Sequence, residues 1–344
     1  MPCARGFYNR YSAAMKFLRV SALCFCTFLL ALEGFGQTVQ SNGVRPTGIE
    51  PPPPKAQAVR PARSVSDDDE EAATPKPKAK RARARTPRAA AADTGTPKTI
   101  GGVPITGAKS VIMIDANTGH VFYEKNADET RAAASTQKLL TALIVAENGN
   151  LDRPVTVEQT DTLAEPVKLN IKPGDTYQRI DLLRALLVKS PNDVARCLAR
   201  DQAGSIEAFA VMMNEKARQL GAVHSHFVNP NGLPIPDQYS SARDLSLIAR
   251  AAYANPVIRS IVCLPKLTFR FANGRTRELE NTNKVLKQHP NCNGMKTGYT
   301  EAAGHCLICS GSRPGRDVIV VVLGDTKSGV WRDASALLSW GLLM

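Results

Sequence analysis

The chain has 344 residues, of which 43% are hydrophobic, so it can form a sizeable core and is not a wholly disordered protein. Its net charge of +13 is unevenly distributed, because residues 1–99 contain 16 Lys and Arg against 8 Asp and Glu, whereas residues 100–344 contain 28 against 23. The basic character therefore belongs mostly to the N-terminal segment, and it does not by itself indicate a nucleic-acid-binding protein.

The N-terminus has the features of a secretory signal peptide. Basic residues precede an apolar run from Val20 to Leu32, which is shorter than the ~20 residues that a membrane-spanning helix needs. The small residues of Gly34-Phe35-Gly36 then suit cleavage before Gln37. We predict a signal peptide over residues 1–36, with Met15 as an alternative start, and an exported protein that is periplasmic, or extracellular and associated with the cell wall. An uncleaved membrane anchor is the alternative.

Residues 37–100 have the composition of an extended linker. They contain the proline run Pro51–Pro54, an acidic block at 67–71, and a stretch at 76–88 that is rich in Lys, Arg, Ala and Pro. Such a segment cannot bury enough apolar surface to offset the entropy lost on ordering. We expect a solvated spacer or, alternatively, a peripheral electrostatic contact with an anionic polymer of the cell envelope.

A globular domain is predicted from residue 101 to residue 344. It begins with a hairpin, in which Val111–Asp115 and Val121–Tyr123 flank the turn residues Asn117-Thr118-Gly119. The next element is a helix over Ser135–Glu147, and because it is apolar on nearly every side we expect it to be buried. Further helices are predicted at Asp181–Lys189, Asp193–Gln202, Ile206–Leu220 and Ala242–Ala254.

Strands return in the last part of the chain. The turn Asn273-Gly274 predicts a hairpin between Lys266–Phe271 and Arg275–Glu280. Three more strands and a final helix are predicted at Gly294–Tyr299, His305–Ser310, Asp317–Leu323 and Gly329–Leu343. The order of strands, helices, strands and helix indicates an α+β fold. In this fold an antiparallel sheet formed by both ends of the domain is flanked by helices, with a mostly helical subdomain between them.

The predicted domain contains an odd number of cysteines, namely Cys197, Cys263, Cys292, Cys306 and Cys309. Export predicts an oxidising compartment, but an odd number leaves at least one thiol unpaired. Cys306 and Cys309 fall on opposite faces of one predicted strand with their Cα atoms about 10 Å apart, beyond the ~7 Å that a disulfide can bridge. We expect mostly small buried thiols, with Cys292–Cys309 as the candidate pair.

Three short motifs occur once each and in a fixed order: Ser135-Thr136-Gln137-Lys138, Ser190-Pro191-Asn192 and Lys296-Thr297-Gly298. A serine hydroxyl becomes a good nucleophile only when a base takes its proton. Lys138 lies one helical turn after Ser135 and on the same face, within reach of that proton. Burial, the helix dipole and Lys296 as a second cation are each expected to lower the pKa of Lys138. We therefore predict Ser135 as the nucleophile and Lys138 as the general base.

The middle motif is predicted to assist the proton transfers. Ser190 would carry a proton between Lys138 and the leaving group, and Asn192 would hold Lys138 and a substrate amide. Pro191 is expected to press Ser190 toward an extended backbone. The alternative is that Ser190 or Asn192 only caps the following helix.

The last motif is predicted to lie on an edge strand that pairs with an extended peptide. Lys296 and Thr297 are expected to bind a carboxylate of the substrate, and Gly298 to let the substrate approach the backbone closely. The backbone N–H groups of Ser135 and Tyr299 are the predicted oxyanion hole. The alternative is an ordinary edge strand with a solvated lysine.

The sequence indicates neither a metal site nor a cofactor site. The five histidines have no metal-ligand spacing, and no cysteine pair has zinc-finger spacing. No glycine-rich phosphate loop precedes a helix. We predict no metal, no cofactor and no nucleic-acid partner.

With these motifs, residues 105–343 resemble the D-alanyl-D-alanine carboxypeptidases, the low-molecular-mass penicillin-binding proteins of peptidase family S11. The resemblance implies a serine β-lactamase/DD-peptidase-like fold, and removal of the terminal D-alanine from peptidoglycan stem peptides through a Ser135 acyl-enzyme. It also implies covalent inhibition by β-lactams. Ala134 stands where the family often has proline, and we expect no C-terminal β-domain or amphipathic anchor. The resemblance is also carried by Asp115–Gly119, Ile171–Asp175, Leu182–Asp193, Asn229–Leu233 and Gly294–Thr300.

Three other functions share parts of this pattern. A peptidoglycan DD-endopeptidase, which cuts cross-links, would use the same motifs with different pocket contacts. A class A β-lactamase uses an extra glutamate after the Ser-x-Asn motif, whereas the nearest candidate here, Glu165, precedes Ser190. A non-catalytic wall-binding protein would not need the intact set of motif residues.

Overall fold

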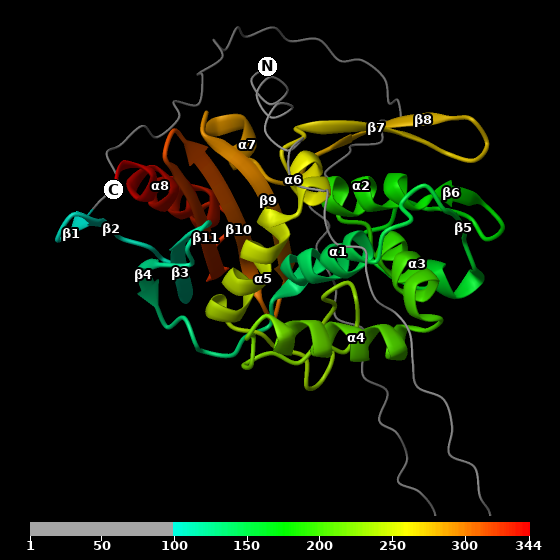
Figure 1. Cartoon of the computed structure of the whole chain (residues 1–344), viewed down its shortest axis with the longest axis horizontal. Coiled ribbons are helices and arrows are strands. Elements are labelled where there is room, and N and C mark those ends of the chain that lie inside the picture. Colours follow the sequence, from blue (N-terminus) through cyan, green and yellow to red (C-terminus); the bar gives the residue numbers. More distant parts are fainter. Residues whose placement is uncertain (1–98) are drawn as a thin grey trace, which may run out of the picture. The chain divides into compact units, whose positions relative to one another are not determined.

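The structure is a computed structural model that describes residues 99–344 (Figure 1). The predicted signal peptide, and the predicted linker except for its last two residues, lie outside the described residues. Those two residues form strand β1 (Thr99–Ile100), which pairs with β2 (Val103–Pro104). Regular structure therefore begins slightly before the domain boundary that we predicted.

A five-stranded antiparallel sheet unites the two ends of the described chain. Its strands follow the order β4-β3-β11-β10-β9, so the early hairpin lies beside the last strand and β9 forms one edge. This arrangement confirms the predicted α+β fold with a sheet built from both ends of the domain. The strands are β3 (Ser110–Asp115), β4 (Val121–Lys125), β9 (Cys292–Thr300), β10 (Gly304–Arg313) and β11 (Arg316–Asp325).

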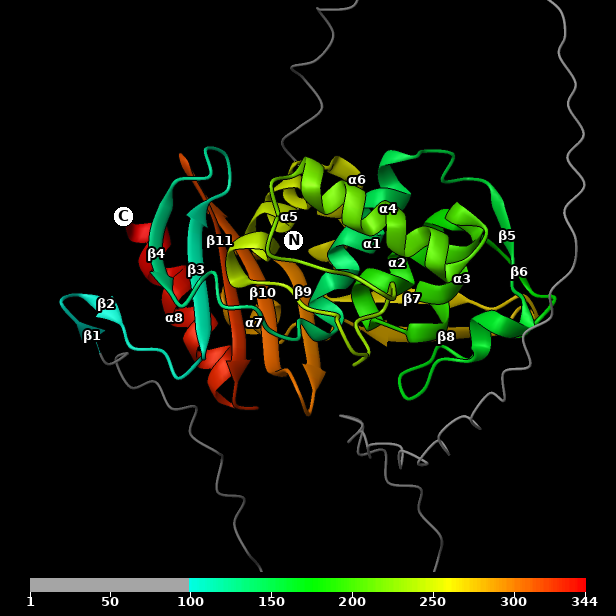
Figure 2. The ribbon, with the colours of Figure 1, turned by 90° about the horizontal axis from the view of Figure 1, so that it is seen from below.

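Helices cover both faces of this sheet. In Figures 1 and 2, α8 (Gly329–Leu343) lies on one face and α5 (Ala242–Ala254) on the other. A strand that is buried on both faces has a continuous apolar sequence rather than an alternating one. Strand β11 shows this pattern, because Val318, Val320 and Val322 join the core under α8. The intervening residues, Ile319, Val321 and Leu323, join the core under the helical region.

Helix α1 (Lys138–Glu147) is the buried helix that the sequence predicted. Its residues from Lys138 to Val145 are all buried, and it packs against α5 and three other helices, α2 (Arg179–Lys189), α3 (Asn192–Ala203) and α4 (Ile206–Gln219). The predicted start at Ser135 is wrong, because Ser135 lies in a preceding 3₁₀ turn, η1 (Ala134–Gln137). Ala134, the first residue of this turn, has a φ of 49°, in the left-handed region.

Several short elements complete the fold. The predicted Asn273-Gly274 hairpin is present as β7 (Lys266–Arg270) and β8 (Thr276–Glu280). Within residues 99–344, no helix is both long and apolar enough to cross a membrane. The sequence did not predict the hairpin β5 (Pro154–Thr156)–β6 (Thr176–Gln178), the 3₁₀ turn η2 (Gln159–Thr162), or the helices α6 (Pro256–Val262) and α7 (Val285–Gln288).

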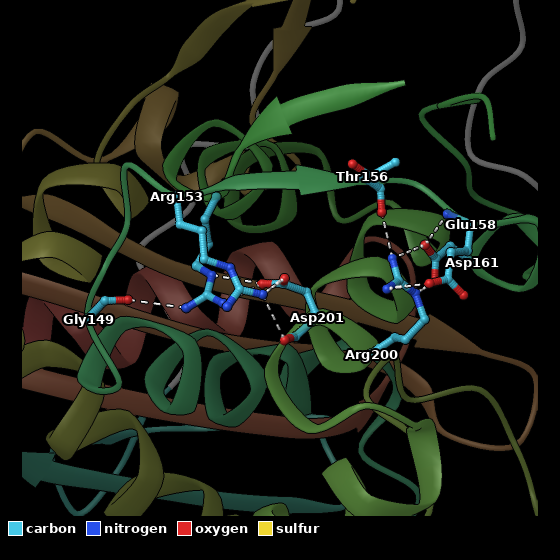
Figure 3. Close-up of polar contacts among 8 residues, drawn as sticks. Gly149, Arg153, Thr156, Glu158, Asp161, Arg200 and Asp201 are labelled. Atoms are coloured by element: carbon cyan, nitrogen blue, oxygen red, sulfur yellow. Dashed lines mark hydrogen bonds and ion pairs between the residues drawn. The ribbon is translucent and has the colours of Figure 1, made fainter. Parts of the chain in front are cut away.

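Two arginine–aspartate pairs hold the helical region together, and they meet at neighbouring residues of α3 (Figure 3). Arg179 of α2 donates to Asp201 through Nε at 2.9 Å and through Nη2, and neither side chain is more than 6% exposed. Arg200 donates to the buried carboxylate of Asp161 in η2 at 3.0 and 2.9 Å. Each pair joins an element outside α3 to that helix. A buried carboxylate is costly unless it is paired, so each arginine compensates the charge of its aspartate.

The Arg179–Asp201 pair predicts a large effect on stability. In Arg179→Met, Asp201 keeps only its contact with the half-exposed Arg153, so we expect the free energy of unfolding to fall by about 3 kcal/mol. Arg184→Met is the matched control, because Arg184 lies on the same helix in an exposed pair with Asp181. Its loss is expected to lower stability by less than ~1 kcal/mol. Urea unfolding measures both variants, and equal losses would contradict the structural role of Arg179.

Candidate active site

The predicted nucleophile and the predicted base meet at the junction of η1 and α1. Lys138 Nζ lies 2.8 Å from Ser135 Oγ, within the distance that a proton transfer requires. Lys138 is completely buried, whereas Ser135 is partly exposed. A ligand can therefore reach the hydroxyl while the amine is shielded from water.

Three oxygen atoms from three parts of the chain surround the Lys138 amine. Besides Ser135 Oγ, Nζ contacts Asn192 Oδ1 at 2.7 Å and the main-chain carbonyl of Asn231 at 2.8 Å. A protonated amine donates all three hydrogens in this arrangement. A neutral amine donates to Asn192 and Asn231, and its lone pair is then directed at the Ser135 hydroxyl. The two carbonyl-type acceptors thus orient the base toward the nucleophile.

Burial and a neighbouring charge favour the neutral form of Lys138. Burial is the main reason that the pKa of Lys138 is well below its ordinary value, and the charge of Lys296 lowers it further. The Asp193 carboxylate acts in the opposite direction. Burial also lowers the pKa of Lys296, to about 7. Lys296 is thus the second cation near Lys138, as the sequence predicted.

Ser190 ends α2 in a left-handed conformation, with φ 69° and ψ 29°. The predicted extended backbone at this residue is therefore wrong. The Ser190 N–H donates to the Leu186 carbonyl at 3.1 Å, so helix closure determines the conformation rather than the following proline. The side chain is buried, and its Oγ has no hydrogen-bond partner among residues 99–344. The role of this hydroxyl as a proton relay between Lys138 and a leaving group stays a prediction.

Lys296 and Thr297 lie on β9, the edge strand that contacts η1. The Lys296 side chain is 1% exposed, and its Nζ donates to the Thr297 carbonyl at 3.0 Å. Thr297 Oγ1 lies 2.6 Å from Thr282 Oγ1. Among the strands of residues 99–344, only β10 pairs with β9. The predicted edge position is confirmed, and β9 also packs against the turn that carries Ser135.

Two glycines allow the main chain to pack closely around Ser135. A Cβ atom on Gly298 would lie 2.8 Å from the Ser135 nitrogen, and one on Gly232 would lie 2.0 Å from the Ala134 carbonyl oxygen. Gly232 also has a φ of 83°, which few other residues adopt. We predicted that Gly298 allows a substrate to approach. In the structure its close neighbour is η1 instead, because β9 runs directly against that turn.

The two predicted oxyanion-hole residues lie on either side of this contact. The Ser135 nitrogen is close to Gly298, and Tyr299 is the next residue of β9. The Tyr299 ring stacks on His305 of β10, with ring centroids 4.3 Å apart. This stacking anchors the end of β9, and the joint action of the two N–H groups stays a prediction.

Sequence reasoning missed the role of the loop that contains Asn231. The Asn231 carbonyl holds Lys138, and Asn229 Oδ1 shapes the loop by accepting from the Gly232 N–H at 2.8 Å. The loop is also bound to α1, because Thr141 Oγ1 donates to the Pro230 carbonyl at 2.7 Å. The run of Asn, Pro and Gly signals a turn. A main-chain acceptor has no side-chain signature, so its part in the site could not be predicted.

Asp193 is a second residue that the prediction omitted. It is buried directly after Asn192, and its carboxylate accepts from the N–H groups of Leu169 at 3.0 Å and Asn170 at 2.8 Å. The Asn192 N–H in turn donates to the Val167 carbonyl at 2.7 Å. These bonds hold residues 167–170 beside the second motif. An acidic residue in the first turn of a helix is common, so the sequence alone did not single it out.

Glu165 lies outside this arrangement. Its side chain is 75% exposed and pairs with Lys168 at 2.7 Å. The structure therefore offers no support for Glu165 as a deacylating glutamate. Over the described range 99–344, no group of three or more His, Cys, Asp or Glu side chains is arranged to hold a metal ion.

A serine beside a buried lysine, with a second lysine on an adjacent strand edge, defines a class of protein. It is the class of serine hydrolases that form an acyl-enzyme and use lysine as the base. Residues 98–327 match the family model described as D-alanyl-D-alanine carboxypeptidase, peptidase family S11. The chain belongs to this family, and the resemblance predicted from its motifs is confirmed.

Relatives in other organisms agree with this assignment. The D-alanyl-D-alanine carboxypeptidase DacB2 of Mycobacterium tuberculosis is 35% identical over 252 residues, which cover 71% of this chain and 86% of that protein. The carboxypeptidase DacA of Escherichia coli is 34% identical, over 74% of this chain and 65% of that protein.

Solved structures confirm the fold. A D-alanyl-D-alanine carboxypeptidase from Mycobacterium tuberculosis superimposes with a TM-score of 0.67 and 34% identity, covering 70% of this chain and 93% of that one. The Streptomyces K15 DD-transpeptidase gives a TM-score of 0.67 and 29% identity, covering 70% of this chain and 99% of that one. The described domain therefore has the DD-peptidase fold.

The lowered pKa of Lys296 predicts how the rate of acylation by a carboxylate-bearing β-lactam depends on pH. The second-order rate constant reports the free enzyme. Lys296 loses its charge as the pH rises through about 7, and with it the attraction for the carboxylate, so the rate constant should fall above this pH. In Lys296→Arg the guanidinium stays charged, so this alkaline fall should disappear. A fluorescent penicillin measures the rate constant, and a wild-type value that stays constant far above pH 7 would contradict the role of Lys296.

Proposed function

We propose that this protein is a serine-type D-Ala-D-Ala carboxypeptidase. It would remove the terminal D-alanine from peptidoglycan stem peptides through a Ser135 acyl-enzyme, and β-lactams would acylate the same serine. The observation that carries the proposal is the 2.8 Å contact between Ser135 Oγ and the buried Nζ of Lys138. Membership of the D-alanyl-D-alanine carboxypeptidase family supplies the substrate class.

Acylation begins at the hydroxyl of Ser135. Its proton passes to the neutral Nζ of Lys138 while Oγ attacks the carbonyl carbon of the penultimate D-alanine. The N–H groups of Ser135 and Tyr299 stabilise the oxyanion, and each such donor is typically worth about 3 kcal/mol. The departing amine receives a proton through Ser190, whose Oγ is buried and unpartnered within the described residues. Water then hydrolyses the ester and frees Ser135.

The edge of β9 positions the substrate for this attack. An extended stem peptide would pair with the free side of the strand through main-chain hydrogen bonds. Lys296 and Thr297 would bind the carboxylate of the terminal D-alanine. Asn192, whose Oδ1 holds Lys138, would use its amide nitrogen to contact a substrate amide. Substrate binding thus places the scissile carbonyl beside η1.

Cleavage of peptidoglycan cross-links is a second candidate function. The D-alanyl-D-alanine endopeptidases of Pseudomonas aeruginosa and Escherichia coli are 32% and 33% identical to this chain. The chain spans 83% and 80% of their lengths, close to the 86% of the carboxypeptidase DacB2 that it spans. The same acylation chemistry would serve either substrate, and pocket contacts would decide between them.

We place the reaction outside the cytoplasm, in the periplasm or at the cell wall. Residues 1–36 have the features of a signal peptide, and peptidoglycan is the substrate class of the family. The basic linker over residues 37–100 would add a peripheral contact with anionic envelope polymers. The signal peptide and the linker, except for its last two residues, lie outside the described residues, so these proposals depend on sequence alone.

Labelling with a fluorescent penicillin tests the proposed nucleophile. We expect covalent labelling of the wild-type protein and a loss of at least about a thousandfold in labelling rate in Ser135→Ala. Ser312→Ala is the matched control, because Ser312 is a partly exposed serine on β10 and should label normally. Failure of the folded wild-type protein to label, or labelling that persists in Ser135→Ala, would contradict the proposal.

Two purified substrates separate the two candidate functions. Incubation with the pentapeptide monomer should release D-alanine, and this release should disappear in Ser135→Ala. Incubation with a cross-linked dimer yields monomers only if the protein is an endopeptidase. Monomer formation without D-alanine release would overturn the carboxypeptidase proposal in favour of the second candidate.

A further inference from the structure

Two cysteines on neighbouring strands of the sheet, β9 and β10, lie close enough to react with each other. The Sγ atoms of Cys292 on β9 and Cys309 on β10 are 3.5 Å apart, and both thiols are free. In the pairing of β9 with β10, Cys292 lies opposite Gly311 and Cys309 opposite Met295, so the two cysteines are diagonal neighbours across adjacent strands. From a separation of 3.5 Å, the sulfur atoms would have to move together by about 1.5 Å to form a bond.

We propose that Cys292 and Cys309 are a redox modification site, where exposure to a disulfide oxidant forms a bond that ties the strand carrying Lys296 to the rest of the sheet. The proposal concerns the fold around the site and does not depend on the proposed function. The product is a disulfide bond within the chain. The oxidant is a small disulfide compound, of the kind found in the oxidising compartment that we predict for this protein.

The packing of the cysteines selects this pair. Cys309 belongs to the core cluster under α8, and Cys292 packs against the same cluster. Cys306 and Cys197 belong to the other core cluster, on the helical side of the sheet. The sheet therefore separates Cys306 from Cys309, as the sequence predicted, and leaves Cys292 as the thiol that faces Cys309.

The different exposures of the two thiols set the order of the reaction. Cys292 is partly exposed, whereas Cys309 is completely buried. The hydrogen bond between the thiols lowers the pKa of Cys292 and raises that of Cys309. Cys292 is thus the thiol that an oxidant reaches first.

The bond forms by two thiol–disulfide exchanges. The Cys292 thiolate attacks one sulfur of the oxidant RS–SR, which forms a mixed disulfide and releases the first RS⁻. Cys309 then loses its proton, and its sulfur attacks Cys292 Sγ and displaces the second RS⁻. The two protons of the protein thiols end on the two RS⁻ groups, so the oxidant is reduced to two RSH and the protein loses two hydrogen atoms.

The cross-link would fix the beginning of β9, the strand that carries Lys296. As an edge strand, β9 pairs only with β10 among the described strands. Near its start, the Gly294 carbonyl accepts from Asn283 Nδ2 at 3.0 Å and lies 3.3 Å from Cys292 Sγ. A covalent bond at Cys292 would add a tie between β9 and β10 four residues before Lys296.

Peptide mapping tests the proposal directly. The full chain is treated with oxidised glutathione, alkylated under denaturing conditions without reduction, and digested. We expect a linked pair of peptides containing Cys292 and Cys309, lighter than the two thiol peptides by the mass of two hydrogen atoms. The linked pair should disappear after reduction. Recovery of both cysteines as alkylated thiols, or in bonds to other cysteines, would overturn the proposal.

Thermal unfolding of the oxidised and reduced proteins provides a second test. The bond closes a segment between residues 17 apart in the sequence, so oxidation should raise Tm by about 5–10 °C. Cys263→Ser is the matched control, because Cys263 is also partly exposed and its replacement should leave the rise intact. In Cys292→Ser the rise should be absent, and a rise that persists there would contradict the assignment. Neither test measures penicillin labelling, so a failure of the disulfide proposal can be distinguished from a failure of the proposed function.

Discussion

The hydrogen bonds of the buried Lys138 amine are the interaction on which the candidate active site depends. They join the turn before α1, the beginning of α3 and the loop at Asn231, which are distant in sequence. These partners also fix the orientation of the amine. When its two hydrogens are donated to the oxygens of Asn192 and Asn231, the lone pair of the neutral amine is directed at Ser135. The same contacts that assemble the helical region around α1 therefore prepare the base for proton transfer.

A second constraint is that two lysines are buried near each other. A buried charge is costly unless it is paired, and this favours the neutral form. The charge of Lys296 strengthens that tendency at Lys138, while Asp193 opposes it. The second lysine lies on β9, an edge strand that packs against η1.

Much of the fold could be predicted from the sequence because its hydrophobic pattern is consistent over long elements. The continuous apolar residues of β11 and the helix apolar on all sides at Leu139–Val145 have few alternative placements. Short elements such as α6 and η2 were missed, since their few residues carry little periodicity. The predicted helix start at Ser135 was wrong because Ser135 lies in a 3₁₀ turn, which packs closely against Gly232, a residue distant in sequence.

In the candidate site too, local features could be predicted from the sequence, whereas contacts between distant residues could not. Side-chain chemistry at short spacing, as in Ser135 and Lys138, could be inferred from one helical turn. The Asn231 carbonyl and the close approach of Gly298 to η1 could not, because they depend on main-chain atoms brought together by the tertiary fold. The conformation of Ser190 belongs to this second group, since the closing of α2 overrides the preference imposed by the next proline.

The central claim is that Lys138 is a neutral base in the free protein at physiological pH. NMR titration of lysine side chains labelled at Cε tests it most directly, with Lys138→Arg and Lys296→Arg identifying the two resonances. We predict that the Lys138 resonance titrates far below the ~10.4 of an exposed lysine, in agreement with its buried position. A Lys138 resonance that titrates together with those of the exposed lysines would contradict the claim.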